Sequence, residues 1–350
     1  MQAQRFSTDG HGTGRTSDRV EIEDYSIGGG IVKAAGTDEG VRSKYAVPDV
    51  RDNFTSEPSL VTFDATGTIM ELTSGVGTFY REVLMEGTDF NARLPRPSVF
   101  GESFFKAYAS QCEKDGCFGA ETGMGEEEWW RQVVFETYAG VEELDNEEGL
   151  RHELGEGLGE HCFRKLYDEV FAGGDGWQVK EGAQDFLEEV KGWKKEGVKV
   201  GVISNFDSRL SGILSDLGVS GYFDFVLTSG EVGSNKPSPE IFSRAMDEAG
   251  VADPSLCVHV GDSLSKDVSG ARGAGWHPIF IPNDVSSTVS SPHSNIAGDG
   301  DGEGYTQVGD LWGVLGVFGR EKRGRVIVTT RPVMEEGNDA FAEWDYDGKD

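Results

Sequence analysis

The chain has 350 residues, which is enough for one large domain or two smaller ones. Its formal net charge of −30 and isoelectric point near 4.5 argue against nucleic acid or an anionic membrane as a partner, because both bind basic protein surfaces. No apolar run approaches the roughly 20 residues of a membrane span, and the four cysteines show no metal-ligand spacing, which favours reduced thiols over a disulfide framework.

Residues 1–55 are rich in glycine, serine, threonine and charge, and we expect them to form a poorly ordered leader. A plastid or mitochondrial transit peptide is the alternative, but Asp9, Asp18 and Glu21 argue against it, because such peptides contain few acidic residues. We therefore predict a cytoplasmic protein, with organellar targeting by the leader as the open alternative.

The first predicted strand is the apolar run Leu60-Val-Thr-Phe63, which ends at the carboxylate of Asp64. Ligands of open α/β sheets bind outside the carboxyl ends of the strands. Asp64 would lie at such an end. In the turn Thr66-Gly67-Thr68 that comes after it, Gly67 would allow the backbone to bend sharply and close over a small anion. Considered alone, a structural aspartate in a turn explains this stretch as well as a catalytic one does.

The region from residue 75 to 175 has helical periodicity and no convincing strand. We interpret it as an all-helical cap inserted into an α/β core, which comprises residues 56–74 and 176–318. Linkers are expected near Thr73–Gly77 and Ala172–Gly176, where glycines mark both joints. The Trp129-Trp130 pair is most simply part of the core of this cap, and the alternative is an aromatic wall that faces a substrate.

Strands and helices alternate after Trp177. The predicted strands are Val198–Ile203, Phe223–Leu227, Leu256–Val260 and Pro278–Ile281. The predicted helices are Gly182–Val190, Leu210–Leu217 and Pro239–Ala249, the last with Ser238 as its N-cap and Gly250 as its stop. Asp310–Phe318 is expected to form a further helix or strand, and residues 319–350 a tail. This alternation predicts a mostly parallel, Rossmann-like sheet covered by helices on both faces.

Polar residues at or just after four of the strand ends form a set suited to phosphoryl transfer. A carboxylate such as Asp64 can be the nucleophile that forms an aspartyl phosphate. The hydroxyl of Ser204, the amide of Asn205 and the ammonium of Lys236 can bind phosphoryl oxygens. Further carboxylates, Asp262 and Asp267, can hold Mg²⁺, which prefers oxygen ligands and would offset repulsion between Asp64 and a phosphate.

These motifs resemble, in order and at plausible spacing, the four motifs of the haloacid dehalogenase-like (HAD) hydrolase superfamily. They are Asp64-x-Thr-Gly-Thr, Ser204, Lys236 and Gly261-Asp262-x4-Asp267. The resemblance extends over roughly residues 57–282, through segments such as Lys236-Pro-Ser-Pro-Glu-Ile-Phe242 and His259-Val-Gly-Asp262. It implies a Rossmann-like core with a helical cap that encloses a small phosphorylated substrate.

The resemblance also implies roles for individual residues. Asp64 would be the nucleophile and a magnesium ligand, with the backbone carbonyl of Thr66 and the carboxylate of Asp262 as further ligands. Asp267 would bind the metal or orient its waters. Ser204, Asn205 and Lys236 would bind the phosphate.

One position departs from the phosphatases of the superfamily, which carry a second aspartate two residues after the nucleophile. That aspartate protonates the leaving oxygen and then activates water, and Thr66 can do neither at neutral pH. The intact Gly261-Asp262 argues against a magnesium-independent dehalogenase, and the lack of membrane spans argues against a P-type pump. A phosphonatase-like Schiff base would need a cap lysine, for which Lys106, Lys114 and Lys165 are candidates by position only.

Two hypotheses of different classes follow. The first is a magnesium-dependent hydrolase of a small phosphorylated metabolite, slowed by Thr66. The second is a HAD-fold protein whose catalysis has decayed and which binds a ligand or partner. The first accounts for the presence of the nucleophile, the hydroxyl, the lysine and the metal carboxylates, and the second accounts for the missing acid.

Overall fold

The computed structural model describes residues 57–88, 94–146, 150–283, 304–318 and 329–332. The predicted leader over 1–55 lies outside these ranges, and so does the predicted tail except for residues 329–332. Within the described residues, no helix combines the length and apolar character needed to cross a membrane.

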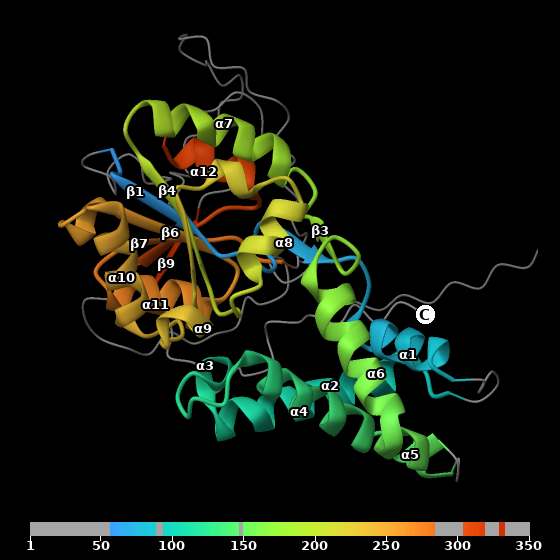
Figure 1. Ribbon diagram of the computed structural model, residues 1–350. Coiled ribbons are helices and arrows are strands. Elements are labelled where there is room, and N and C mark those ends of the chain that lie inside the picture. The colour runs from blue at the N-terminus through green and yellow to red at the C-terminus, as the bar shows by residue number, and fades with distance from the viewer. Residues whose placement is uncertain (1–56, 89–93, 147–149, 284–303, 319–328, 333–350) are drawn as a thin grey trace, which may run out of the picture. The chain divides into compact units, whose positions relative to one another are not determined.

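A seven-stranded sheet carries the α/β part of the chain, with the strand order β5-β4-β1-β6-β7-β8-β9 (Figure 1). The strands are β1 Leu60–Phe63, β4 Lys199–Ser204, β5 Phe225–Thr228, β6 Cys257–Gly261, β7 His277–Phe280, β8 Gly304–Gln307 and β9 Thr329–Pro332. Every neighbouring pair is parallel except β8 and β9. The predicted fold, a mostly parallel Rossmann-like sheet with flanking helices, is confirmed.

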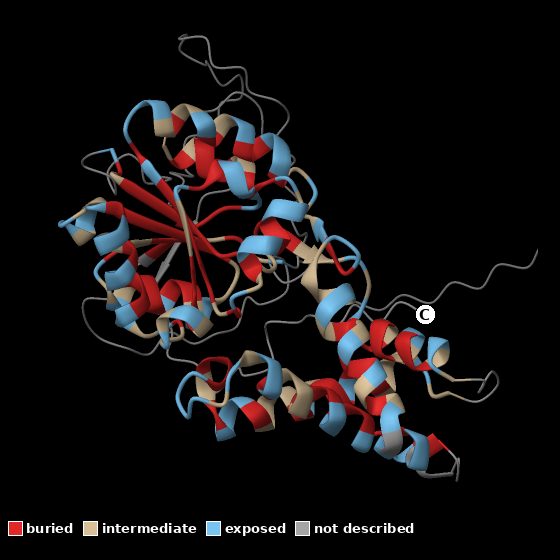
Figure 2. Cartoon of the chain, viewed as in Figure 1, coloured by how far each residue is buried: buried red, intermediate tan, exposed pale blue. Residues whose placement is uncertain are grey.

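Strand β1 lies in the interior of the sheet, where it pairs with β4 on one side and β6 on the other. All four of its residues are buried, as expected for a parallel strand with both faces covered (Figure 2). Phe63 pairs in register with Val202 of β4 and Val260 of β6. Asp64 therefore follows β1 at the carboxyl edge, level with Ile203 near the end of β4 and with Gly261 at the end of β6.

Helices cover both faces of this sheet (Figure 1). One apolar cluster joins the strands to α7 Ala183–Lys195, α8 Leu210–Asp216 and α12 Leu311–Val317. The other joins them to α10 Pro239–Ala249 and α11 Ser269–Gly273. The segment after Asp310 is thus a helix, and not a strand.

The helix α10 begins and ends at the residues that the sequence predicts. Gly250 adopts a left-handed conformation with φ +69° at the C-terminal end, where an L-residue would be strained. Ser238 precedes the helix, but its hydroxyl donates to the Glu240 carboxylate instead of accepting a helix N–H. The predicted side-chain cap is therefore absent, because the neighbouring acid binds the hydroxyl.

The chain between residues 75 and 175 contains helices and turns and no strand in its described segments. Its α-helices are α1 Val76–Glu86, α2 Pro97–Lys114, α3 Gly116–Gly119, α4 Glu126–Ala139, α5 Leu150–Glu153 and α6 Gly159–Arg164. They surround an apolar cluster of their own, separate from the two clusters of the sheet. This segregation of buried side chains supports an independent helical unit.

A two-stranded antiparallel ribbon lies at the base of this helical unit and was not predicted. It pairs β2 Met70–Leu72 with β3 Trp177–Val179. Beyond the ribbon, the Thr73 amide donates to the Gly176 carbonyl at 2.9 Å. The two connections between the helices and the sheet therefore run side by side.

We propose the cap boundaries at residues 75 and 175, and limited proteolysis tests them. Gly174 and Asp175 are exposed, and glycines make this connection an accessible substrate for a protease. Among the described residues, cleavage near 73–77 and 172–176 is expected before any cleavage within 198–260, as peptide mass mapping would show. Initial cleavage within 198–260 would contradict the proposed layout.

Candidate active site

Three carboxylates converge at the carboxyl edge of the sheet. Asp64 follows β1, Asp262 follows β6, and Asp267 lies one turn further along the chain. One oxygen from each lies within 4.8 Å of the others. A Cβ atom at Gly67, where φ is +79°, would lie 2.1 Å from Asp262 Oδ2. The turn after β1 thus approaches Asp262 as closely as only glycine allows.

Lys236 lies between two of these carboxylates, in the loop that joins α9 Ser229–Val232 to α10. Its Nζ lies 2.7 Å from Asp64 Oδ1 and 2.7 Å from Asp267 Oδ1, and it donates to the Ile203 carbonyl at 2.9 Å. The three N–H donors of the ammonium therefore have three acceptors. Burial alone would lower the pKa of Lys236, but the charges of Asp267 and Asp64 outweigh it and raise the pKa above its ordinary value. The lysine is therefore a permanent cation beside Asp64.

The side chain of Asn205 holds the backbone of Lys236. Its Oδ1 accepts from the Lys236 amide at 2.7 Å, and its Nδ2 donates to the Lys236 carbonyl at 3.0 Å. Asn205 also lines the cavity beside Asp64, together with Ser204 and Thr66. The predicted phosphate-binding residues are thus adjacent, with Asn205 engaged in positioning the lysine.

A histidine beneath Asp267 escaped the sequence-based prediction of the site. His259 Nε2 lies 2.9 Å from Asp267 Oδ1, and His259 Nδ1 lies 2.8 Å from Thr62 Oγ1. Burial holds the pKa of His259 below its ordinary value despite the neighbouring carboxylate, so the ring is neutral. A neutral ring beside a carboxylate donates from Nε2, and the Thr62 hydroxyl then donates to Nδ1.

Asp267 consequently has donors at both of its oxygens. Oδ1 receives Lys236 and His259, and Oδ2 accepts the Ser263 amide at 2.9 Å. Burial would raise the pKa of Asp267, but the Lys236 charge and the hydrogen bond from His259 outweigh it and hold the pKa well below its usual range. Asp267 is therefore an ionised carboxylate with a fixed orientation.

A second lysine, also not predicted, lies at the rim of the carboxylate cluster. Lys180 donates to the Gly67 carbonyl and to Asn283 Oδ1, and Asn283 in turn donates to Asp262. These contacts connect β3, β7 and the turn after Asp64. They hold that turn against Asp262.

A cavity opens above Asp64 and is lined by residues of both the sheet and the helical unit. The polar residues of its lining are Asp64, Thr66, Ser204, Asn205 and Arg209. The others are Val76, Tyr80, Phe104, Tyr108, Phe118, Trp130, Val134, Leu166, Tyr167, Phe171, Trp177 and Phe206. The carboxylate nucleophile expected from the sequence thus faces a largely aromatic enclosure.

The two adjacent tryptophans have different environments. Trp129 is buried in the apolar cluster of the helices, and its Nε1 donates to the Asp115 carbonyl at 2.7 Å. Trp130 is half-buried and lines the cavity. Trp129 is therefore part of the core of the helical unit, as predicted, whereas Trp130 lies in the cavity wall, and a substrate-facing role for it stays a prediction.

Asp207 joins the helical unit to the loop after β4. Its fully buried carboxylate accepts from Arg209 Nε at 2.9 Å, from Arg209 Nη2 at 2.6 Å and from Trp130 Nε1 at 2.7 Å. Arg209 also donates to the Tyr167 carbonyl at 2.8 Å, and its guanidinium lies 3.9 Å from the centre of the Tyr167 ring. One carboxylate thus fixes a cation and an aromatic side chain of the cavity wall.

Replacing Asp207 with alanine is expected to destabilise the protein by about 3–5 kcal/mol, because the buried Arg209 would lose its counter-ion. Chemical denaturation would measure this loss. Asp185→Ala, at an exposed position on α7, is the matched control and should change stability little. A free energy of unfolding unchanged in Asp207→Ala would show that the pair does not hold the cavity wall.

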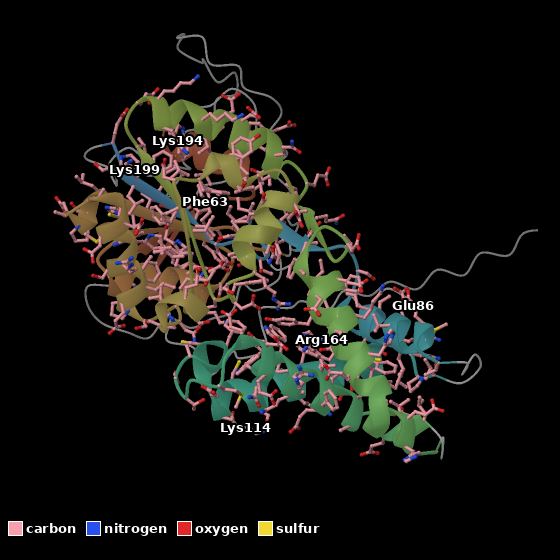
Figure 3. The ribbon with its side chains drawn as sticks, viewed as in Figure 1. Phe63, Glu86, Lys114, Arg164, Lys194 and Lys199 are labelled. Atoms are coloured by element: carbon pink, nitrogen blue, oxygen red, sulfur yellow. The ribbon has the colours of Figure 1, made fainter. Side chains whose placement is uncertain are left out.

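The three cap lysines considered for a Schiff base do not line the cavity. Lys106 is exposed. Lys114 lies on the outer surface of the helical unit, 3.5 Å from Glu136 (Figure 3). Lys165 pairs with Glu169 at 2.6 Å. Their surroundings are those of surface lysines, as the sequence-based interpretation favoured.

Comparison with known proteins agrees with this arrangement. Residues 58–275 match the family described as haloacid dehalogenase-like hydrolase. The chain is 33% identical over 225 residues to haloacid dehalogenase-like hydrolase domain-containing protein 3 of Bos taurus, covering 63% of this chain and 81% of that protein. It is 32% identical over 228 residues to the rhythmically expressed gene 2 protein of Drosophila melanogaster, covering 63% and 82% of the two chains.

Among solved structures, a 2-haloacid dehalogenase from Pseudomonas syringae matches with a TM-score of 0.47 at 22% identity, covering 75% of this chain and 99% of that one. The family match spans well over half of the sequence, and Asp64, Ser204, Lys236, Asp262 and Asp267 all lie within the matched range. The chain belongs to the haloacid dehalogenase-like hydrolase family.

Proposed function

We propose that this protein is a magnesium-dependent hydrolase of phosphate monoesters that forms an aspartyl phosphate on Asp64. The observation that carries the proposal is the charge of the site. Three carboxylates lie together with the buried ammonium of Lys236, and the charge of Lys180 at the rim acts on Asp262, so the sheet edge keeps a net negative charge. Lys180, at the rim, contacts Gly67 and Asn283. A phosphate dianion could not approach this cluster without a further cation.

The residues present fit a hard divalent cation. Carboxylate oxygens are the ligands that Mg²⁺ prefers, and it usually binds one or two carboxylates while keeping several waters. Asp64 and Asp262 would be direct ligands together with the Thr66 backbone carbonyl. Asp267, with protein donors at both oxygens, would orient metal-bound waters instead. The bound metal would offset the charge of the phosphate.

The chain's own residues would carry the reaction. A carboxylate oxygen of Asp64 attacks phosphorus, and the bond from phosphorus to the leaving oxygen breaks. Lys236 and the Ser204 hydroxyl stabilise the charge on the phosphoryl oxygens. Water then attacks the aspartyl phosphate, which releases phosphate and restores Asp64. The leaving oxygen takes its proton from water, because Thr66 provides no acid.

The alternative is a HAD-fold protein that binds a ligand without turnover, which the missing acid at Thr66 favours. A screen of the purified protein against phosphate monoesters with Mg²⁺ separates the two functions. Turnover that depends on both Mg²⁺ and Asp64 supports the hydrolase. Binding of phosphate esters without turnover supports the alternative.

Magnesium is expected to raise the melting temperature. At a concentration 100-fold above the dissociation constant the gain is about 2.7 kcal/mol, or roughly 5–10 °C at about 2–4 °C per kcal/mol. Asp262→Ala should abolish the response, because the half-buried Asp262 is a direct ligand in this proposal. Asp185→Ala should retain it. Absence of any heat of binding to wild-type protein at millimolar Mg²⁺ would contradict the proposed site.

A further inference from the structure

The polar residues that line the cavity above Asp64 are unevenly distributed, and their distribution indicates which kind of substrate the cavity would bind. Four of its polar lining residues, Asp64, Thr66, Ser204 and Asn205, come from the carboxyl end of β4 and from the turns after β1 and β4. Apart from Arg209, the remaining lining residues are aromatic or aliphatic. A phosphate held at Asp64 would therefore place the rest of the substrate against apolar side chains.

The one cation among the residues that line this enclosure is already neutralised. The Arg209 guanidinium donates twice to Asp207 and once to the Tyr167 carbonyl. Its side chain is 15% exposed and that of Asp207 is fully buried, so the pair has little contact with water. A second charged group on the substrate would consequently lose its hydration in the cavity without gaining a free counter-ion.

Aromatic rings of the helical unit line part of the cavity and form its aromatic wall. Trp130 stacks on Phe118 with a centroid distance of 5.8 Å and an interplanar angle of 26°, and Tyr108 lies 5.9 Å from Trp130. The hydrogen bond from Trp130 to Asp207 fixes the orientation of this indole. A flat ring gains offset or edge contacts with such a wall. Among the aromatic and aliphatic lining residues, a polyhydroxylated group would find polar side-chain atoms only on the tyrosines and the two tryptophans.

The absence of an acid at Thr66 independently favours a substrate with an aromatic leaving group. An alkoxide is a poor leaving group without a proton donor, because alcohols are about as weakly acidic as water, with a pKa near 15.7. A phenolate leaves without protonation far more readily, because the pKa of a phenol is about 10. Both the chemistry at Thr66 and the shape of the wall suit an aryl leaving group.

We propose that the substrate is the phosphate monoester of a phenol whose ring is uncharged. This inference rests on the proposed hydrolase function and specifies its substrate class. Asp64 attacks phosphorus, and the phosphorus–oxygen bond to the ring breaks with its electron pair remaining on the phenolate. The phenolate then takes a proton from water after leaving the site. The aromatic wall binds the ring in both the substrate and the departing phenol.

Three esters separate the contribution of the ring from that of the leaving group. Phenyl phosphate has both a ring and a phenolate leaving group, benzyl phosphate has a ring and an alkoxide, and glycerol phosphate has only the alkoxide. With Mg²⁺ and the full chain, benzyl phosphate should have a KM roughly 10–100-fold below that of glycerol phosphate, the factor expected for burying a ring. In the first step, phosphoryl transfer to Asp64, phenyl phosphate should react faster than benzyl phosphate by roughly 10² or more, as burst-phase kinetics would measure.

Trp130→Ala should raise KM for phenyl and benzyl phosphate, because it removes a face of the aromatic wall. Phe135→Ala is the matched control, since Phe135 lies on the same helix, is 38% exposed and does not line the cavity. It should leave the order of the three esters unchanged. Binding of benzylphosphonate, which cannot be hydrolysed at this bond, gives a second measurement that does not depend on turnover.

The outcomes distinguish the inference from the function on which it rests. Turnover of glycerol phosphate at a kcat/KM equal to or above that of phenyl phosphate would overturn the aryl assignment and leave the hydrolase intact. Binding of benzylphosphonate that Trp130→Ala does not weaken would also overturn it. Failure to hydrolyse any of the three esters, with no Mg²⁺-dependent binding of the phosphonate, would count against the hydrolase itself.

Discussion

Replacing Asp64 with asparagine is expected to lower the turnover of phosphate esters by at least about 10⁴-fold, because an amide is not a competent nucleophile and removal of a nucleophile has effects of this size or larger. The variant should still fold. Asparagine has nearly the same volume, and Lys236 would keep Asp267 and the Ile203 carbonyl as acceptors.

Chemical trapping of the aspartyl phosphate tests this prediction by a measurement other than the turnover rate. Acid quenching of wild-type protein during turnover should leave phosphate on Asp64 as an acyl phosphate that hydroxylamine cleaves. The asparagine variant should trap none. Asp247→Asn, at an exposed position on α10, is the matched control and should keep wild-type turnover. Equal turnover by wild type and Asp64→Asn would show that phosphoryl transfer does not pass through this carboxylate.

The central strands of the sheet could be predicted because each is a short, mostly apolar run between turns. Residues 60–63 and 257–261 are buried throughout, as the apolar side chains in their sequences predict. Strand β8 at Gly304–Gln307 was missed, since it follows a segment rich in glycine and aspartate. Its partners β7 and β9 give it strand structure, and a single sequence does not reveal such pairing.

The candidate site residues could be predicted because they lie at or after the ends of strands. The residues that form hydrogen bonds to them from elsewhere in the fold could not be predicted in this way. His259 lies within a buried strand, and its spacing does not distinguish it from a residue that only packs in the core. The signal that could have identified it is the presence of a histidine inside an apolar run. Lys180 and Asn283 reach the site only through the folding of β3 and the end of β7 toward the turn at Gly67.

The tryptophan pair shows how helix geometry divides neighbouring residues. Adjacent positions on an α-helix point about 100° apart, since 3.6 residues make one turn. Two neighbouring side chains on one helix therefore point in different directions. Trp129 is buried among the helices, and Trp130, one position further, lines the cavity.

Introducing a carboxyl group at position 66 is the most informative gain-of-function test. Thr66 is half-buried and lines the cavity beside Asp64, so the carboxyl group of Thr66→Asp would lie close to a bound ester. General acid–base catalysis contributes roughly 10²–10⁴ in rate, which corresponds to about 3–5 kcal/mol of barrier. Proximity to the Asp64 charge would raise the pKa of the new acid, which favours its protonated form.

The gain should depend on the leaving group. Turnover of benzyl phosphate should rise by roughly 10²-fold or more, because its alkoxide needs a proton. Phenyl phosphate should gain less in the first step, since a phenolate leaves unprotonated, although hydrolysis of the aspartyl phosphate would still benefit from the added base. Burst-phase kinetics would resolve the two steps.

Thr66→Asn is the matched control for this gain, because it has the shape of aspartate and can neither give nor take the proton. It should show no gain, and the double variant with Asp64→Asn should be inactive because no nucleophile remains. The result to watch is a Thr66→Asp protein that folds normally and binds Mg²⁺ yet hydrolyses no phosphate ester faster than wild type. Since the nucleophile, the lysine and the metal carboxylates would all be in place, such a result would remove the main support for a slowed hydrolase. The ligand-binding function would then account better for a site that keeps these residues.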